Sequence, residues 1–132
     1  MIPYDTSFTP PAMTLSVIIA GVVHRRPRLE VSALIDTGAD ITAVPEAFLE
    51  RLKLYPVGRV TIEDATATMT PMFTYDAILI LAGEEPKKME VVLTPYPFVI
   101  LGRDWLRDFY VFLDGPGQQF KLSRSKLQIQ EP

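Results

Sequence analysis

Apolar and polar residues follow one another along this chain in short blocks, and most apolar blocks have the length and composition of strands. Several are rich in β-branched residues and end at glycine, proline or charged residues, which is typical of strands bounded by turns. The strands predicted in this way cover residues 15–23, 29–35, 41–44, 57–62, 73–81, 89–93, 98–101, 110–113 and 118–122. The pattern therefore predicts a mainly β protein.

Two short helices are expected between these strands. Pro45 suits the first turn of a helix, and the acidic and apolar residues that follow it up to Leu52 predict a short amphipathic helix. A second helix is predicted at Asp104, whose negative charge is favoured in a first turn. Its apolar side would carry Trp105 and Phe109.

Residues 63–72 separate two predicted strands and differ from them in composition. They are polar, rich in small residues and free of glycine, and they contain Pro71. Two strands joined by such a segment predict a hairpin with a mobile tip.

The composition fits a single globular domain. A chain of 132 residues can bury a sizeable core, and 48% hydrophobic with 22% charged residues is typical of soluble proteins. The net charge of −3 gives no electrostatic reason to expect nucleic acid as the main partner. The chain has no cysteine, which excludes disulfides, thiolate metal sites and a cysteine nucleophile.

The apolar run from Leu15 to Val23 is too short to span a bilayer. The residues before it include Asp5 but no lysine or arginine, unlike the start of a signal peptide. We therefore expect no membrane partner and a cytoplasmic location. The following turn, His24–Arg28, is basic, but no aromatic residues are interleaved with its charges, so we favour a solvated turn over a nucleic-acid site.

Residues 33–40, Ala-Leu-Ile-Asp-Thr-Gly-Ala-Asp, carry an apolar strand into a tight turn with a carboxylate. A carboxylate at the end of a buried strand is costly unless it is hydrogen-bonded or held for chemistry. A second apolar strand ends in Gly102-Arg103-Asp104, at the start of the second predicted helix. Together these motifs resemble the two signatures of the retropepsins, the retroviral-type aspartic proteases. The resemblance covers roughly residues 14–123.

The resemblance implies a mainly β, retropepsin-like fold: a closed β-barrel with one or two short helices and a flap hairpin. The protease domain would cover residues 14–123, after an irregular arm over 1–13 and before a C-terminal tail over 124–132. The implied activity is that of an aspartic endopeptidase, which acts on peptide or protein substrates without a metal or other cofactor. Because the chain has one Asp-Thr-Gly motif and is too short for two lobes, the complete enzyme would be a homodimer.

The resemblance also assigns roles to particular residues. The catalytic residues would be Asp36, Thr37 and Gly38, with Asp36 of each subunit meeting on the dimer axis. Substrate would be bound by Gly38, Ala39, Asp40, Ile41, Phe98 and Ile100. Asp40 would also pair with Arg103, and an Arg–carboxylate pair of this kind would fix the turn beneath the active site.

Several alternatives remain open. The tip without glycine departs from the glycine-rich viral flaps, so an inactive peptide-binding or dimerisation module with the same fold is the second hypothesis. A third is nucleic-acid binding through Arg25, Arg26 and Arg28. Residues 110–113 could pack inside one subunit or form the dimer seam, and we favour the seam because both faces of this strand are apolar.

Overall fold

The computed structural model describes residues 1–24 and 26–126. Within these residues the chain forms ten strands and two short helices, which confirms the predicted mainly β fold. The elements are β1 (Ile2–Pro3), β2 (Thr14–Gly21), β3 (Leu29–Ile35), β4 (Ala43–Pro45), α1 (Phe48–Arg51), β5 (Pro56–Glu63), β6 (Met69–Ile80), β7 (Lys87–Thr94), β8 (Val99–Leu101), α2 (Arg103–Leu106), β9 (Tyr110–Asp114) and β10 (Gln119–Ser123).

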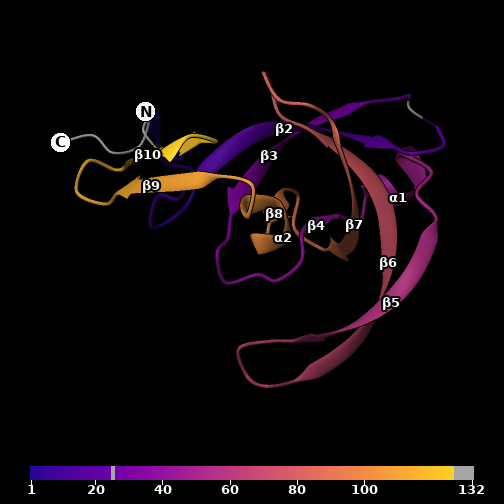
Figure 1. Ribbon diagram of the computed structural model, residues 1–132. Coiled ribbons are helices and arrows are strands. Elements are labelled where there is room, and N and C mark those ends of the chain that lie inside the picture. The colour runs from indigo at the N-terminus through magenta and orange to yellow at the C-terminus, as the bar shows by residue number, and fades with distance from the viewer. Residues whose placement is uncertain (25, 127–132) are drawn as a thin grey trace.

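Seven strands form one strongly curved sheet in the order β2-β3-β8-β4-β7-β6-β5. An additional antiparallel pairing of β2 with β6 closes this sheet on itself, and Figure 1 shows the strands curving around a common interior. Two pairings within it are parallel: β3 with β8 and β4 with β7. The parallel pair β3–β8 brings the ends of both sequence motifs to the same edge of the sheet.

The core lies inside this closed sheet. Strand β2 illustrates how the sequence produces it, because Leu15, Val17 and Ile19 point inward while Ser16 between them is exposed. Burying an apolar side chain of this size contributes about 1.5–3 kcal/mol. The largest fully buried apolar side chains are Phe120, Ile19, Leu52, Leu79, Leu101, Val17, Val44, Val91 and Val99.

The two ends of the described chain meet in a second, three-stranded sheet, in the order β1-β10-β9 (Figure 1). Ile2 of β1 pairs with Phe120 of β10, and the Phe120 side chain is fully buried in the core. An irregular arm was predicted over residues 1–13. Residues 2–3 instead form strand β1, because the edge of β10 is free to pair with them. Strand β9 lies at the outer edge of this sheet.

The prediction of Pro45 in the first turn of a helix was wrong. Pro45 ends β4, where it is buried and pairs with Thr94 of the parallel strand β7. Proline is tolerated at the end of a strand, and the amide of Glu46 donates the next hydrogen bond to the Thr94 carbonyl at 2.8 Å. Helix α1 therefore begins only at Phe48.

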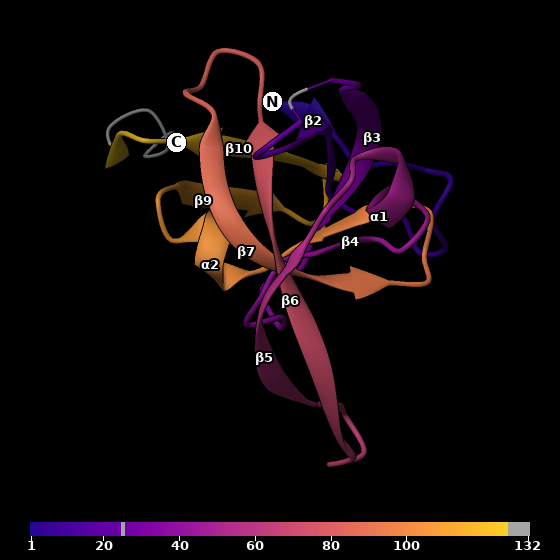
Figure 2. The ribbon, with the colours of Figure 1, turned by 90° about the vertical axis from the view of Figure 1, so that its right-hand side faces the viewer.

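The predicted hairpin is present, but its second strand begins earlier than expected. A strand was predicted from Phe73, whereas β6 begins at Met69, so residues 69–72 belong to the strand. Pro71 is accommodated because β7 pairs with β6 only from Tyr75 onward, which leaves one side of β6 unpaired at Pro71. Figure 2 shows the β5–β6 hairpin projecting well beyond the rest of the molecule.

The tip closes without glycine because Asp64 caps it. The Asp64 carboxylate accepts hydrogen bonds from the Thr66 amide at 2.8 Å, the Thr66 hydroxyl at 2.7 Å and the Thr68 amide at 3.0 Å. Ala67 has a positive φ of 62°, a backbone conformation that glycine adopts more often than alanine. Side-chain capping thus replaces the glycine expected of such a tip.

Arg25 of the basic turn and residues 127–132 of the expected tail lie outside the described residues. The domain bounds of residues 14–123 remain a prediction. Helices α1 and α2 have four residues each, and no helix in the described part of the chain is long and apolar enough to cross a membrane.

The capped tip leads to a first prediction. Replacing Asp64 with alanine removes all three hydrogen bonds, so we expect faster amide exchange at Thr66 and Thr68 by NMR. Global stability should change little because the tip is exposed. Asp64→Asn, which keeps one acceptor oxygen, serves as the control and should show a smaller increase; equal exchange in the alanine variant and wild type would contradict this account.

The same cap predicts a pH dependence. The Thr66 hydroxyl, followed by the Thr68 and Thr66 amides, lowers the pKa of Asp64 below its ordinary value of 3.8. The ordered tip is therefore favoured above that value and is lost as the pH falls through the lowered pKa. We expect the amide protection of Thr66 and Thr68 to fall in that acid range in the wild type, whereas protection in Asp64→Asn should change little with pH.

Candidate active site

Asp36 stands at the point where β3 leaves the barrel. Its amide donates to the Leu101 carbonyl of the neighbouring strand β8 at 3.0 Å, which extends the β3–β8 pairing by one bond. Its carboxylate accepts the Gly38 amide at 2.9 Å, and its carbonyl accepts the Ala39 amide at 3.2 Å. Asp36 is partly buried, whereas Thr37 and Gly38 are exposed. A carboxylate is thus held at the rim of the sheet on a turn open to solvent.

Arg103 binds the same turn from α2. Its guanidinium Nη1 donates to the Thr37 carbonyl at 2.6 Å, and Nη2 forms an ion pair with Asp40. Its backbone amide donates to the Ala39 carbonyl at 2.8 Å. The structure therefore brings Arg103 and Asp40 together, as the resemblance implied. Both side chains are exposed, at 54% and 84%, so the pair orients the turn more than it stabilises the fold.

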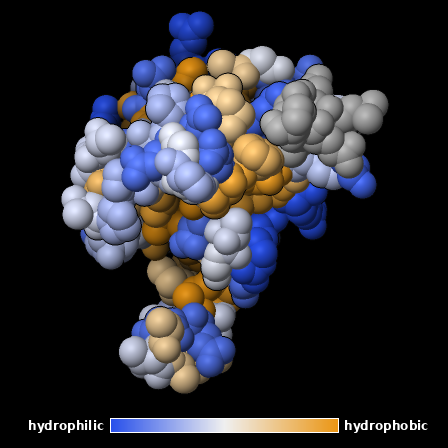
Figure 3. Space-filling model, turned by 90° about the vertical axis from the view of Figure 1, so that its left-hand side faces the viewer, coloured by the Kyte–Doolittle hydropathy of each residue, from blue (hydrophilic) through white to orange (hydrophobic). Residues whose placement is uncertain are grey.

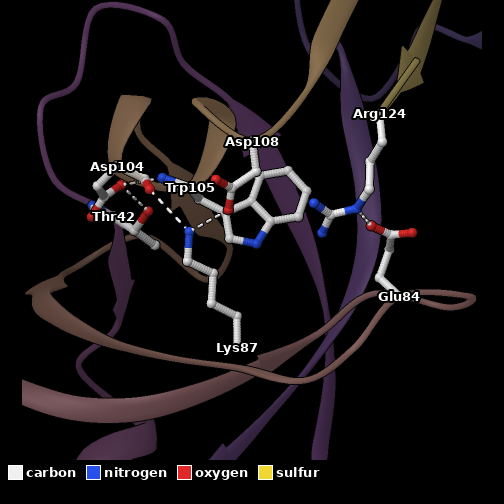
Figure 4. A network of polar contacts seen from close by, with 7 residues as sticks. All are labelled: Thr42, Glu84, Lys87, Asp104, Trp105, Asp108 and Arg124. Atoms are coloured by element: carbon white, nitrogen blue, oxygen red, sulfur yellow. Dashed lines mark hydrogen bonds and ion pairs between the residues drawn. The ribbon is translucent and has the colours of Figure 1, made fainter.

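A partly buried hydrogen-bond network around Asp104 supports the segment that follows this turn (Figure 4). Its carboxylate accepts the Thr42 amide at 3.0 Å, the Thr42 hydroxyl at 2.7 Å and the Trp105 amide at 2.9 Å. The Thr42 hydroxyl in turn accepts the Gly102 amide at 3.1 Å. These bonds satisfy a fully buried threonine and fasten the segment after the Asp36 turn to the start of α2.

Gly102 is needed where the two motifs touch. A Cβ at this position would lie 2.9 Å from both the Ala39 carbonyl oxygen and the Ile41 carbonyl carbon. These are backbone atoms, which cannot move aside as a flexible side chain can. The absence of a side chain therefore allows the loop over residues 36–42 to pack directly on the β8–α2 turn.

The Asp104–Thr42 network was not predicted from the sequence, in which Asp104 was expected only as a favourable charge at a helix start. The available signal was Thr42, a polar residue within a short apolar run between Ile41 and Ala43. A polar side chain in such a run must find a partner when it is buried.

The other residues expected to bind substrate lie on two neighbouring segments, the loop after Asp36 and the segment of β8. Ala39 and Ile41 lie in the loop over residues 36–42, and both are partly buried. Ile100 lies in β8, paired with Leu34 on one side. Phe98 precedes β8, about 10 Å along the chain from Leu101 at the rise of an extended strand. Phe98 therefore lies next to the end of β8 that is farther from Asp36.

Phe98 belongs to an aromatic cluster that the sequence analysis missed. Its ring stacks on Tyr96 with centroids 5.2 Å apart and meets the edge of Phe8 at 5.1 Å. Phe8 comes from the N-terminal arm, so nothing in the local sequence indicated this contact. Within residues 1–24 and 26–126, no three histidine, aspartate or glutamate side chains gather as metal ligands would.

Comparison with known proteins places this geometry in a family. No curated protein matches the chain. Among solved structures, the chain is similar to the Simian Foamy Virus (mac) protease, with 26% identity, a TM-score of 0.53, and coverage of 72% of this chain and 92% of that one.

Two further solved structures are similar. The EIAV protease bound to the inhibitor HBY-793 has 26% identity and a TM-score of 0.53, over 74% of this chain and 86% of that one. A foamy viral protease-reverse transcriptase in complex with an RNA/DNA hybrid has 25% identity and a TM-score of 0.52, over 70% of this chain but only 11% of that one. A family model described as retroviral aspartyl protease matches residues 10–114. Because that match spans well over half of the chain, the protein belongs to the retroviral aspartyl protease family.

Proposed function

We propose that this protein is an aspartic endopeptidase that hydrolyses peptide bonds as a homodimer. The observation that carries the proposal is the placement of Asp36: its carboxylate stands at the rim of the sheet, on a turn held by Arg103 and supported by the partly buried Asp104–Thr42 network. Membership of the retroviral aspartyl protease family supports the same chemistry.

The chemistry requires a second carboxylate. In aspartic proteases two carboxylates about 3 Å apart share one proton, because like charges so close cannot both ionise. The ionised acid removes a proton from a water molecule, which attacks the peptide carbonyl. The protonated acid donates a hydrogen bond to the carbonyl oxygen, and protons then pass to the leaving amine. In this proposal the two acids are Asp36 and its copy in the partner subunit.

The remaining residues of the loop would bind the substrate. The Gly38 carbonyl would accept a hydrogen bond from the peptide, and Asp40 would contact the peptide backbone while paired with Arg103. Ala39 and Ile41, with Phe98 and Ile100 farther along, would line apolar subsites. The β5–β6 hairpin would fold over the bound peptide as a flap.

The three-stranded sheet is the proposed dimer seam. On its outer strand β9 the large apolar side chains of Tyr110, Phe112 and Leu113 are 47%, 37% and 56% exposed. Figure 3 shows apolar side chains gathered on the face of the molecule that carries this sheet. An exposed apolar surface of this kind on an edge strand favours association with another chain. A second copy placed here would also supply the missing acid.

The catalytic role of Asp36 is tested by Asp36→Asn, which keeps the shape of the side chain but cannot supply the ionised acid. We expect cleavage of an unstructured protein to fall by about 10²–10⁴-fold, the range associated with a general acid or base. The assay should cover acidic to neutral pH. The variant should unfold at the same temperature as the wild type.

Two results would go against the proposal. Cleavage that survives in Asp36→Asn would reject the mechanism. A folded wild-type dimer that cleaves no peptide of a diverse library would favour the alternative function, an inactive peptide-binding or dimerisation module.

The dimer seam is tested by Leu113→Glu, which places a charge on the exposed apolar strand. We expect sedimentation to show a weaker dimer, and activity to fall at low protein concentration and recover at high concentration. Val23→Glu is the matched control, because Val23 is also an exposed aliphatic residue, at 70%, but lies outside the three-stranded sheet. An unchanged dimer in Leu113→Glu would place the seam elsewhere, and a stable monomer that still cleaves peptides would overturn the dyad.

A further inference from the structure

Lys87, the first residue of β7, reaches across to α2 and the turn that follows it. Its ammonium group donates to the Asp108 carboxylate at 2.8 Å and to the Asp104 backbone carbonyl at 3.2 Å (Figure 4). The side chains of Lys87 and Asp108 are only 28% and 37% exposed. The bond to Asp108 is charge-assisted, and the second bond to the Asp104 carbonyl restrains the Lys87 ammonium further than a single surface ion pair would.

The position of these contacts links Lys87 to the active site. A helix leaves its last carbonyl groups without backbone donors, and α2 has only four residues. Lys87 supplies a donor and a positive charge there, which suits the C-terminal end of a helix. The carbonyl that it binds belongs to Asp104, whose side chain holds Thr42 beneath the catalytic turn. Lys87 thus binds the backbone, and Thr42 the side chain, of the same residue.

A second contact joins the same part of the chain to α2. Glu84, in the turn between β6 and β7, forms an ion pair with Arg124, which follows β10. The Arg124 guanidinium lies 4.7 Å above the Phe109 ring, and Phe109 stacks on the buried Trp105 of α2 at 4.6 Å. Two independent contacts therefore hold the β6–β7 turn against α2 and the residues after it.

We propose that Lys87 is a positioning residue that fixes α2 against β7 and, through Asp104 and Thr42, keeps the loop of Asp36 in its working geometry. The inference rests on the proposed function for its effect on catalysis. Its effect on the loop itself does not require any activity.

The ion pair with Lys87 requires the Asp108 carboxylate to be negatively charged. The hydrogen bond from Lys87, together with the charges of Lys87, Arg107 and Arg124, lowers the pKa of Asp108 below its ordinary value of 3.8. The contact is therefore complete above that value and is lost only as the pH falls through the lowered pKa. An assay at mildly acidic or neutral pH examines the pair while both groups are charged.

The test compares Lys87→Met, which keeps the apolar stem but removes the charge, with Lys88→Met. Lys88 is the matched control because it is adjacent in β7, is 61% exposed, and lies 3.6 Å from Asp76 on β6 instead of contacting α2. Lys87→Arg restores a positive charge and a donor. Amide exchange at Thr42 and Trp105 is measured in all variants, and kcat and KM are measured at concentrations where each has the wild-type sedimentation coefficient.

In Lys87→Met we expect amide exchange at Thr42 and Trp105 to rise, and kcat to fall, each by about tenfold, as for the loss of one charge-assisted hydrogen bond. KM should change by less than about twofold, because Lys87 does not touch substrate. Lys88→Met should behave as the wild type, and Lys87→Arg should recover most of the loss.

Exchange rates in Lys87→Met equal to those in Lys88→Met would overturn the inference, as would an unchanged kcat in an active enzyme. A wild-type protein that cleaves nothing would instead overturn the proposed function. The exchange rates alone would then decide whether Lys87 holds the loop.

Discussion

The hydrogen bonds between Asp104 and Thr42 are the interaction on which the candidate active site depends. They join residues 62 positions apart in the sequence, and so connect the loop that carries Asp36 to helix α2. Thr42 is fully buried, and leaving such a polar group without a partner costs about 1–3 kcal/mol. The loop is therefore anchored to the barrel, although the turn at its outer end is open to solvent.

Arg103 has a different part in the same site. Its ion pair with Asp40 is largely exposed, and pairs of that kind contribute about 0–1 kcal/mol. Its further bonds to the carbonyls of Thr37 and Ala39 restrict the backbone on both sides of Gly38. The bonds to the buried Thr42 thus stabilise the loop, whereas the Arg103 guanidinium orients its turn. Both sets of contacts require Gly102, because only a residue without a side chain lets the backbone of the Asp36 loop pack directly on the β8–α2 turn.

The strands were largely predictable from the sequence, and the errors have specific physical causes. Pro45 was assigned to a helix because its local signals fit one, but a parallel pairing with Thr94 retained it in a strand. The second strand of the hairpin was predicted to begin only at Phe73 because polar residues and Pro71 discourage a strand, whereas pairing with β5 forms one from Met69 onward. In both cases a partner distant in sequence outweighed a local preference.

By itself, the sequence determined the mainly β class and the turn at Asp36, because strand periodicity and short motifs are local properties. The pairing of Asp40 with Arg103, 63 positions apart, was implied by the family resemblance and not by any local pattern. Only the tertiary structure decided that Asp104 supports Thr42, that Phe8 packs on Phe98 and that Lys87 binds α2. Each of these contacts joins segments that are separated in the chain. The curvature and pairing of the strands determine which side chains meet, and no local sequence pattern predicts that.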